Sequence, residues 1–365
     1  RNPSLDTGSR AGSDTRSCAG TGAGTGTGTG RWQLGWVMNQ AAVDVASDAV
    51  LGGIHAAVST TEGNLPTHTS SLRIMGTKAN ITTVAGPADL PARIEELLHT
   101  LNQLWSRFLD DSEISTLNNT PGVAQQVSPE TLRLFDQMAR GFSQTDGQFD
   151  PTVLPALIHE GYSTSLVHPD RTTRVPAGSA ARGDFSRIVV EGNTVTLPAG
   201  TTVDSGGLGK GLAADMSVEL ALSAGALGAL VEIGGDVRVA GMSPRSDRWR
   251  LGIEDPRDAD TRLDIVELRH QGLATSTVTK RRFAVGDRET HHIINPETRR
   301  SSNSDTIQAS VIAGSAVEAE MWTKVAFVGG SHELLNQAHR RGFHAACVLE
   351  SGEWVTSPQW PSADA

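Results

Sequence analysis

Residues 203–211, which read VDSGGLGKG, combine features that suit the binding of an anionic ligand. The four glycines allow the backbone to approach a ligand closely, and a helix that begins here would present free N–H groups. Lys210 adds a positive charge, so the segment suits a pyrophosphate group. A Walker A loop would require Ser or Thr at Gly211, and a Rossmann fingerprint would require Gly or Ala at Leu212. Neither motif is present, and a Gly-rich tight turn is the alternative interpretation.

Three further segments place polar side chains at expected turns or strand ends. Residues 146–152 read DGQFDPT and put an acid beside an aromatic, although a plain turn would explain them equally well. Residues 232–236 read EIGGD, which is most simply a hairpin turn. His291 and His292 lie at an expected strand start, where adjacent side chains point to opposite faces. Only one of the two histidines can therefore face a site.

The elements that must position these segments are both helices and strands. Amphipathic spacing and helix-capping residues predict five helices, at 90–108, 129–142, 211–224, 315–328 and 331–342. Short apolar runs predict strands at 187–190, 194–197, 229–233, 237–240, 249–254, 263–269, 292–295, 307–313 and 345–349. Tight Gly turns join several of these strands as antiparallel hairpins. The pattern predicts an α+β fold and not a regular βαβ alternation.

Composition divides the 365 residues into one folded unit with extensions. Residues 1–70 begin with a Gly/Thr/Ser-rich stretch that cannot bury enough apolar surface to order itself, so we expect an extension without a stable fold. A single domain is expected over 71–357, followed by a tail at 358–365.

Bulk properties exclude several classes of function. The net charge of −10 argues against non-specific nucleic-acid binding, which needs clustered Lys and Arg. The two cysteines, Cys18 and Cys347, give no disulfide framework. No apolar run is long enough to span a membrane, and no signal peptide is visible. We therefore expect a cytoplasmic protein, or an exported or membrane-associated one if the N-terminus is incomplete.

The order of the motifs resembles the FAD:protein FMN transferases, the ApbE-type flavin transferases. Each motif alone is weak, but they follow one another in the family's order over residues 71–330. They are MGT at 75–77, WSRF at 105–108, SEI at 112–114, LN at 117–118, DGQFDPT at 146–152, DSGGLGKG at 204–211 with Asp215, IGGD at 233–236, ATS at 274–276, HIINPET at 292–298 and AE at 319–320.

This resemblance implies a domain of mixed, largely antiparallel sheets flanked by helices, with two lobes around an FAD cleft. It implies transfer of FMN from FAD to a Ser or Thr hydroxyl of an acceptor protein, with release of AMP. The implied FAD-contacting residues are Met75, Phe108, Gln148, Phe149, Asp150, Asp204, Lys210 and Ile293. His292 and Lys210 would act catalytically on the pyrophosphate, and Mg²⁺ would be held by the Gly207 backbone oxygen, Glu320 and Thr323.

The expected metal-binding helix departs from the family's pattern. The family has Ala-Asp-x-x-Ser/Thr-Thr where this chain has AEMWTK at 319–324. Glu320 remains a plausible oxygen ligand, but Lys324 has no lone pair to give. An ammonium about 4 Å from a divalent ion would cost about 8 kcal/mol at an effective dielectric of about 20. Lys324 therefore either pairs with Glu320 or replaces the metal as the charge beside the pyrophosphate.

Smaller departures affect catalysis more than FAD binding. Thr277 stands where the family has Gly after Thr-Ser, and Asn295 and Arg299 replace the Asp and Gly of Asp-Pro-x-Thr-Gly. Three functions stay open: the Mg²⁺-dependent transferase, a module that binds or delivers FAD without transferring FMN, and a flavin-using oxidoreductase. The last has the least support, because no separate nicotinamide site is visible.

Overall fold

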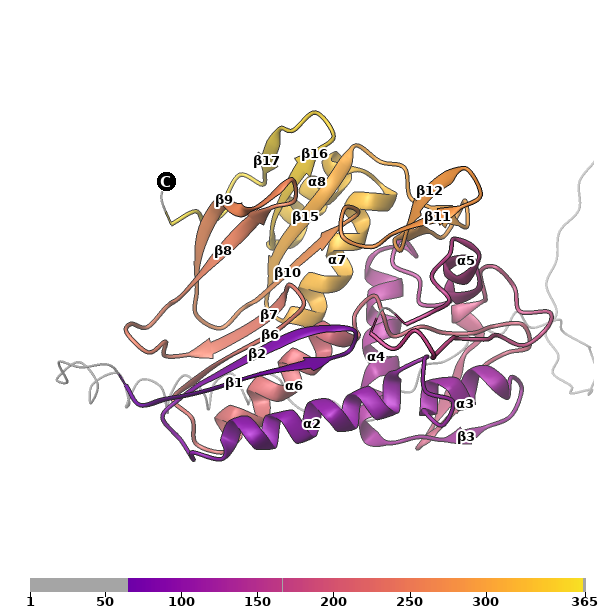
Figure 1. The fold of residues 1–365 in the computed structure, drawn as a ribbon, viewed down its shortest axis with the longest axis horizontal. Coiled ribbons are helices and arrows are strands. Elements are labelled where there is room, and N and C mark those ends of the chain that lie inside the picture. The colour runs from indigo at the N-terminus through magenta and orange to yellow at the C-terminus, as the bar shows by residue number, and fades with distance from the viewer. Residues whose placement is uncertain (1–64, 166, 364–365) are drawn as a thin grey trace, which may run out of the picture. The chain divides into compact units, whose positions relative to one another are not determined.

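An eight-stranded sheet organises the part of the chain that the computed structural model describes, residues 65–165 and 167–363 (Figure 1). Every neighbouring pair of strands is antiparallel. In spatial order the strands are β1 (Thr67–Ile74), β2 (Thr77–Val84), β6 (Gly228–Ile233), β7 (Asp236–Gly241), β10 (Gly272–Thr277), β15 (Thr306–Ala313), β16 (His344–Leu349) and β17 (Trp354–Thr356). The fold is α+β with a largely antiparallel sheet, as predicted.

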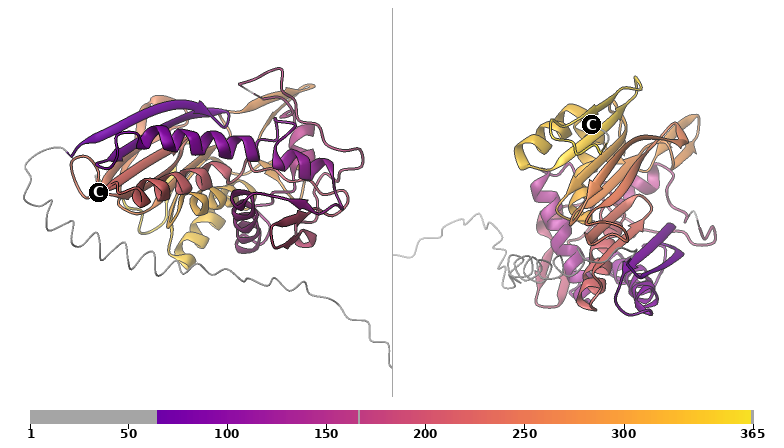
Figure 2. Two further views of the ribbon diagram at one scale, coloured as in Figure 1. Left: turned by 90° about the horizontal axis from the view of Figure 1, so that it is seen from below. Right: turned by 90° about the vertical axis from the view of Figure 1, so that its left-hand side faces the viewer.

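Helices cover one face of this sheet. They are α2 (Leu90–Trp105), α6 (Gly209–Ser223), α7 (Ala316–Val328) and α8 (Ser331–Arg341). In Figure 2, α2 and α6 run side by side along the sheet. Helix α7 begins where the hydroxyl of Ser315 accepts a hydrogen bond from Glu318 N, and Asp215 accepts two more from Ala316 N and Val317 N. These caps connect the start of α7 to α6.

A long hairpin covers the opposite face. It consists of β8 (Trp249–Asp255) and β9 (Asp258–Leu268). Because side chains alternate along a strand, Val237 and Val239 of β7 pack toward this hairpin. Asp236 and Ala240 therefore point the other way, toward the helices. This alternation places the Asp236 carboxylate near the start of α6.

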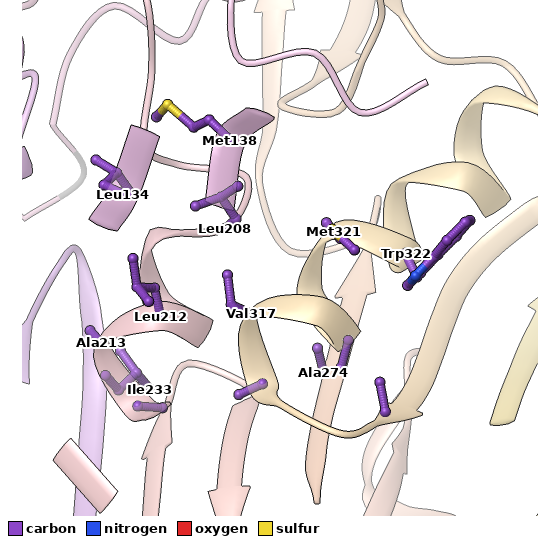
Figure 3. Close-up of a cluster of buried hydrophobic side chains, with 14 of the residues drawn as sticks. Leu134, Met138, Leu208, Leu212, Ala213, Ile233, Ala274, Val317, Met321 and Trp322 are labelled. Atoms are coloured by element: carbon purple, nitrogen blue, oxygen red, sulfur yellow. The ribbon is translucent and has the colours of Figure 1, made fainter. Parts of the chain in front are cut away.

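A buried apolar cluster holds α6 and α7 against α4 (Pro129–Gln144), as Figure 3 shows. The labelled members come from these three helices and the adjoining loop and strands: Leu134, Met138, Leu208, Leu212, Ala213, Ile233, Ala274, Val317, Met321 and Trp322. Gly211 makes this packing possible, since a Cβ there would lie 2.5 Å from the Ala316 backbone oxygen. The cluster fixes the relative positions of Lys210 on α6 and Glu320 on α7.

The remaining elements are short. They are α3 (Glu113–Asn119), β3 (Gln125–Gln126), α5 (Leu154–His159), a 3₁₀ turn (Phe185–Arg187), β4 (Val189–Glu191), β5 (Thr194–Thr196), β11 (Arg282–Val285), β12 (Arg288–His291), β13 (Ile294–Asn295) and β14 (Arg300–Ser301). The five predicted helices and eight of the nine predicted strands are confirmed within a few residues at each end. The pattern did not predict β1, β2 or β10.

The predicted strand at 292–295 is wrong at its start. His291 ends β12 and His292 lies in a bend, so the next strand starts only at Ile294. The bend arises because Ile293 N donates a hydrogen bond to Nδ1 of His291 at 3.3 Å, which replaces a strand hydrogen bond. The argument from alternating faces therefore does not apply to the two histidines.

The ends of the described chain differ from the expected boundaries. Strand β1 begins at Thr67, four residues before the expected start of the domain, and most of the expected extension, residues 1–64, lies outside the described residues. The expected tail packs against β9, since Trp360 Nε1 donates to Asp264 at 2.7 Å and the Trp360 ring meets Trp354 edge-on. No helix among the described residues is both long and apolar enough to cross a membrane.

Candidate functional site

A cavity of about 940 Å³ brings the predicted site residues together from segments that are far apart in the chain. This volume is in the range of pockets that hold small-molecule ligands. All of the predicted residues except Thr323 line it: Met75, Phe108, Gln148, Phe149, Asp150, Asp204, Gly207, Lys210, His292, Ile293 and Glu320. Their individual roles stay predictions, but the structure shows that they face one space.

The cavity is basic although the chain as a whole is acidic. Its basic lining residues are Arg73, Lys78, Arg107, Arg171, Lys210, Arg262, Lys280, Arg281 and Lys324, and its acidic ones are Asp150, Asp204, Glu232, Glu254 and Glu320. Nine cations against five anions favour an anionic ligand in a chain whose net charge is −10.

Lys210 lies at the first turn of α6 and pairs with two buried carboxylates. Its ammonium donates to Asp236 of β7 and, at 2.5 Å, to Glu320 of α7. Burial would lower the pKa of Lys210, but the charges of Asp236 and Glu320 outweigh it and raise that pKa. An ammonium has three N–H groups, so one remains for a ligand in the cavity.

The pKa values of the two carboxylates around Lys210 shift in opposite directions. Burial raises the pKa of Asp236 and the nearby Glu320 charge raises it further, with Lys210 opposing both. Burial also acts to raise the pKa of Glu320, but the charges of Lys210 and Lys324 outweigh it and lower that pKa. The Glu320 carboxylate also accepts a hydrogen bond from Gly211 N at 2.8 Å. Glu320 is therefore the carboxylate that stays ionised.

Lys324 also lines the cavity, one helical turn beyond Glu320. Its ammonium donates to three oxygens: the Glu320 backbone at 2.9 Å, Thr323 Oγ1 at 3.0 Å and Ser276 Oγ at 3.1 Å. Burial lowers the pKa of Lys324 to about 8, although the Glu320 charge opposes this. The ammonium therefore remains mostly charged at neutral pH.

The donor set does not fit a divalent ion in the way that the sequence predicts. Both carboxylate oxygens of Glu320 already have partners, Lys210 and Gly211 N. The hydroxyl of Thr323 donates to the Glu320 backbone oxygen at 2.7 Å and is fully buried behind Lys324. Among the described residues, no cluster of three His, Cys, Asp or Glu side chains is arranged to hold a metal.

His292 lies in the bend between β12 and β13 and faces the cavity. Its Nδ1 is buried and has no hydrogen-bond partner among the described residues. Burial lowers the pKa of His292 well below its usual value, and the cations Arg281 and Lys324 lower it further. A neutral imidazole with an unsatisfied nitrogen is thus available to a ligand.

Phe149 and Asp150 support the glycine loop as well as lining the cavity. The Phe149 ring is wedged between two glycines, since a Cβ on Gly141 would lie 2.8 Å from it and one on Gly207 2.9 Å. Asp150 accepts hydrogen bonds from Thr152 and, at 2.6 Å, from Arg182. The Phe149 ring therefore packs against the two glycines, and both carboxylate oxygens of Asp150 accept hydrogen bonds from within the protein.

Arg107 is a cavity residue to which the sequence assigned no role. Its guanidinium carbon lies 4.2 Å from the centre of the Phe108 ring and 4.7 Å from that of Tyr162. Its Nε atom lies 3.6 Å from the Asp204 carboxylate. Tyr162 was missed entirely, because it follows the short helix α5 in a loop without a motif. Arg107 thus connects the expected ring-binding residue Phe108 to the glycine loop.

Met75 forms the tight turn between β1 and β2 at the cavity edge. It has φ +49 and the next residue, Gly76, has φ +73, which is the geometry of a hairpin turn. A non-glycine residue in the left-handed region is uncommon and is often found at functional sites.

Ile293 and Gln148 also line the cavity. Ile293 is buried, and Gln148 has a buried Oε1 without a hydrogen-bond partner among the described residues.

The chain is similar in sequence to known proteins. Residues 75–348 match the profile of the ApbE family. The chain is 30% identical over 257 residues to the FAD:protein FMN transferase of Vibrio cholerae, covering 67% of this chain and 76% of that protein. It is 25% identical over 335 residues to the FAD:protein FMN transferase of Salmonella typhimurium, covering 87% and 95%.

Solved structures agree with the sequence comparison. The ApbE protein of Thermotoga maritima superimposes with a TM-score of 0.71 at 26% identity, covering 80% of this chain and 97% of that one. The flavinyl transferase ApbE of Pseudomonas stutzeri does so with a TM-score of 0.69 at 25% identity, covering 81% and 96%. The profile match covers most of the chain. The chain therefore belongs to the ApbE family.

Proposed function

We propose that this protein transfers FMN from FAD to a Ser or Thr hydroxyl of an acceptor protein and releases AMP. The observation that carries the proposal is the basic cavity in which eleven of the twelve predicted site residues meet. The names of the relatives, FAD:protein FMN transferase, support the same reaction.

The reaction is a phosphoryl transfer that cleaves the FAD pyrophosphate. The acceptor hydroxyl oxygen forms a bond to the FMN phosphorus, the bond from that phosphorus to the bridging oxygen breaks, and AMP leaves with that oxygen. The hydroxyl proton is lost to solvent or to the leaving phosphate. In this scheme the glycine loop at 204–211 faces the pyrophosphate, and the third N–H of Lys210 binds a phosphate oxygen.

His292 would act on the same pyrophosphate as a neutral group. Its pKa is well below the usual value, so the ring contributes a hydrogen bond and no charge near neutral pH. The unpartnered Nδ1 gives it a nitrogen that can accept or donate according to the tautomer. We propose that His292 orients the pyrophosphate or the attacking hydroxyl.

Mg²⁺ is the least supported part of the expected site. If Gly207, Glu320 and Thr323 held it, the ion would supply Lewis-acid stabilisation of the pyrophosphate. Glu320 would first have to leave Lys210 and Gly211 N, and Lys324 would have to move away from Thr323.

A flavin transfer assay tests the proposed function. Purified protein is incubated with FAD and an acceptor protein that has an Asp-x-x-Ser/Thr-Ala-Thr-like segment, and in-gel flavin fluorescence is recorded after denaturation. A fluorescent acceptor band is expected, and it should disappear when the acceptor Ser or Thr is replaced by Ala. Tight FAD binding without any band would refute the transferase.

The second candidate is a protein that binds or delivers FAD without transferring FMN. One observation favours it: Lys324 stands where the family places a metal-binding residue. Equilibrium dialysis would separate the two functions, because a delivery protein returns intact FAD to an apo-flavoprotein whereas a transferase converts FAD into AMP and bound FMN.

A further inference from the structure

Glu320 and Lys324 of α7 both differ from the family's pattern, and their side chains point to different partners. Glu320 is one methylene longer than the Asp of the family's pattern, and its carboxylate reaches Lys210 and the first turn of α6. The carboxylate therefore faces away from Lys324, whose ammonium contacts only the backbone oxygen of Glu320. Both oxygens of the longer acid are therefore occupied by partners on α6.

The ammonium of Lys324 lies among the residues that were expected to hold the metal. It lies 3.0 Å from Thr323 Oγ1 and 2.9 Å from the Glu320 backbone oxygen. Its Cε atom lies 3.9 Å from where a Cβ on Gly207 would stand. The three residues expected to surround Mg²⁺ thus surround the end of the Lys324 side chain.

Three hydrogen bonds hold the Lys324 ammonium in place. The three donors of the ammonium have three oxygen partners, with Ser276 Oγ as the third. All of these oxygens are uncharged, so no carboxylate is hydrogen-bonded to the ammonium. The group also lines the cavity, where its charge can act on an anion over a short distance.

We propose that the Lys324 ammonium takes the place of the divalent ion, so that this protein binds the FAD pyrophosphate with built-in lysine charges and without Mg²⁺. Lys210 supplies the directional hydrogen bond and Lys324 supplies a fixed positive charge behind it. The inference rests on the proposed use of FAD, but the predicted absence of a divalent-ion site can be tested without FAD.

The experiment measures FAD affinity and metal binding on the full chain. FAD titrations by flavin fluorescence are run in EDTA and in MgCl₂, and free Mn²⁺ is followed by electron paramagnetic resonance. The variants are Lys324→Thr combined with Glu320→Asp, which restores the family's residues, and Lys324→Met, which removes the charge and offers no oxygen. Thermal unfolding verifies that each variant is folded.

The wild type is expected to bind FAD equally well in both media, within about twofold, and to leave the Mn²⁺ signal unchanged. Lys324→Met should weaken FAD binding about tenfold or more in both media. The double variant should bind FAD about tenfold more tightly with Mg²⁺ than with EDTA and should take up Mn²⁺. If Lys324→Met does not fold, the gain of metal binding by the double variant still supports the proposal.

Two results would overturn the proposal. One is a wild-type protein that takes up Mn²⁺ or requires Mg²⁺ for FAD binding, and the other is a Lys324→Met variant with unchanged FAD affinity. A wild type that binds no FAD in either medium would refute the proposed function instead. In that case Mn²⁺ uptake by the wild type would refute this inference too, and uptake by the double variant alone would support it.

Discussion

The ammonium of Lys210 lies 2.5 Å from the carboxylate of Glu320, although the two residues are 110 positions apart in the chain. The same ammonium binds Asp236, and the carboxylate side chains are only 2% and 1% exposed. Two buried acids therefore share one hydrogen-bonded cation. The acid expected to bind a metal instead connects α7 to the start of α6.

Replacing Lys210 by Met should destabilise the protein by about 3 kcal/mol near pH 8, because two buried carboxylates lose the cation that is hydrogen-bonded to them. The loss should be smaller near pH 5. Without Lys210 the pKa of Asp236 rises still further above its unfolded value, so stability is greatest at low pH and is lost as the pH rises through that pKa. Urea unfolding at both pH values measures this. An equal loss of stability at both pH values would contradict the prediction. The control is Lys280→Met, which removes an exposed ion pair.

Replacing His292 by Ala should reduce FMN transfer about 100-fold while changing protein stability little. Because its pKa lies well below the usual value, His292 stays neutral between about pH 6 and pH 8, so no titration of this ring should appear in the wild-type rate profile there. Initial rates of acceptor labelling test both points. His99→Ala, on the exposed face of α2, should leave the rate unchanged. A wild-type rate that follows a single ionisation near pH 6.5 would argue against the neutral imidazole.

Glu160 should make the protein sensitive to acid. Its side chain is fully buried, and burial opposes its ionisation, but hydrogen bonds from Arg300, Ser301 and Arg288 outweigh this and lower its pKa to about 2. The resulting stability is complete above the unfolded pKa of 4.5 and is lost as the pH falls toward 2.

Since Arg288 and Arg300 are half exposed and partly screened, we expect this term to be about 2 kcal/mol. Urea unfolding between about pH 5 and pH 2.5 measures it. Glu160→Gln should be less stable near pH 6 and should show a flatter pH dependence. A variant with the same acid sensitivity as the wild type would place the effect on another carboxylate.

Gly211→Ala should destabilise the protein by about 2 kcal/mol, because the new methyl group would collide with backbone atoms of α7 that cannot move independently. The higher helix propensity of Ala offsets only about 1 kcal/mol. FAD affinity should fall as well, since the same contact aligns Lys210 with Glu320. Ser223→Ala, at the exposed end of the same helix, should change stability by less than about 0.5 kcal/mol. A stable Gly211→Ala variant would show that α6 and α7 can separate without penalty.

Much of the fold could be predicted because the signals are local. The helix at 129–144 follows from a Ser cap and a Pro at its first position, and both are seen in α4. Strands β1 and β2 were missed because Thr, Ser and Asn interrupt their alternation, and the pairing of β2 with β6 depends on distant residues. The bend at His292 was missed because a side-chain hydrogen bond from Ile293 N decides it.

The sequence by itself determined which residues could do chemistry: the glycine loop with Lys210, the histidine pair, and the departure at Glu320 and Lys324. Only the tertiary structure decided their partners. Glu320 pairs with Lys210 and not with Lys324 because Gly211 lets α6 and α7 pack closely, while β7 turns Asp236 toward the same point. Side-chain pairing depends on which distant segments meet, and no local pattern in the sequence encodes that meeting.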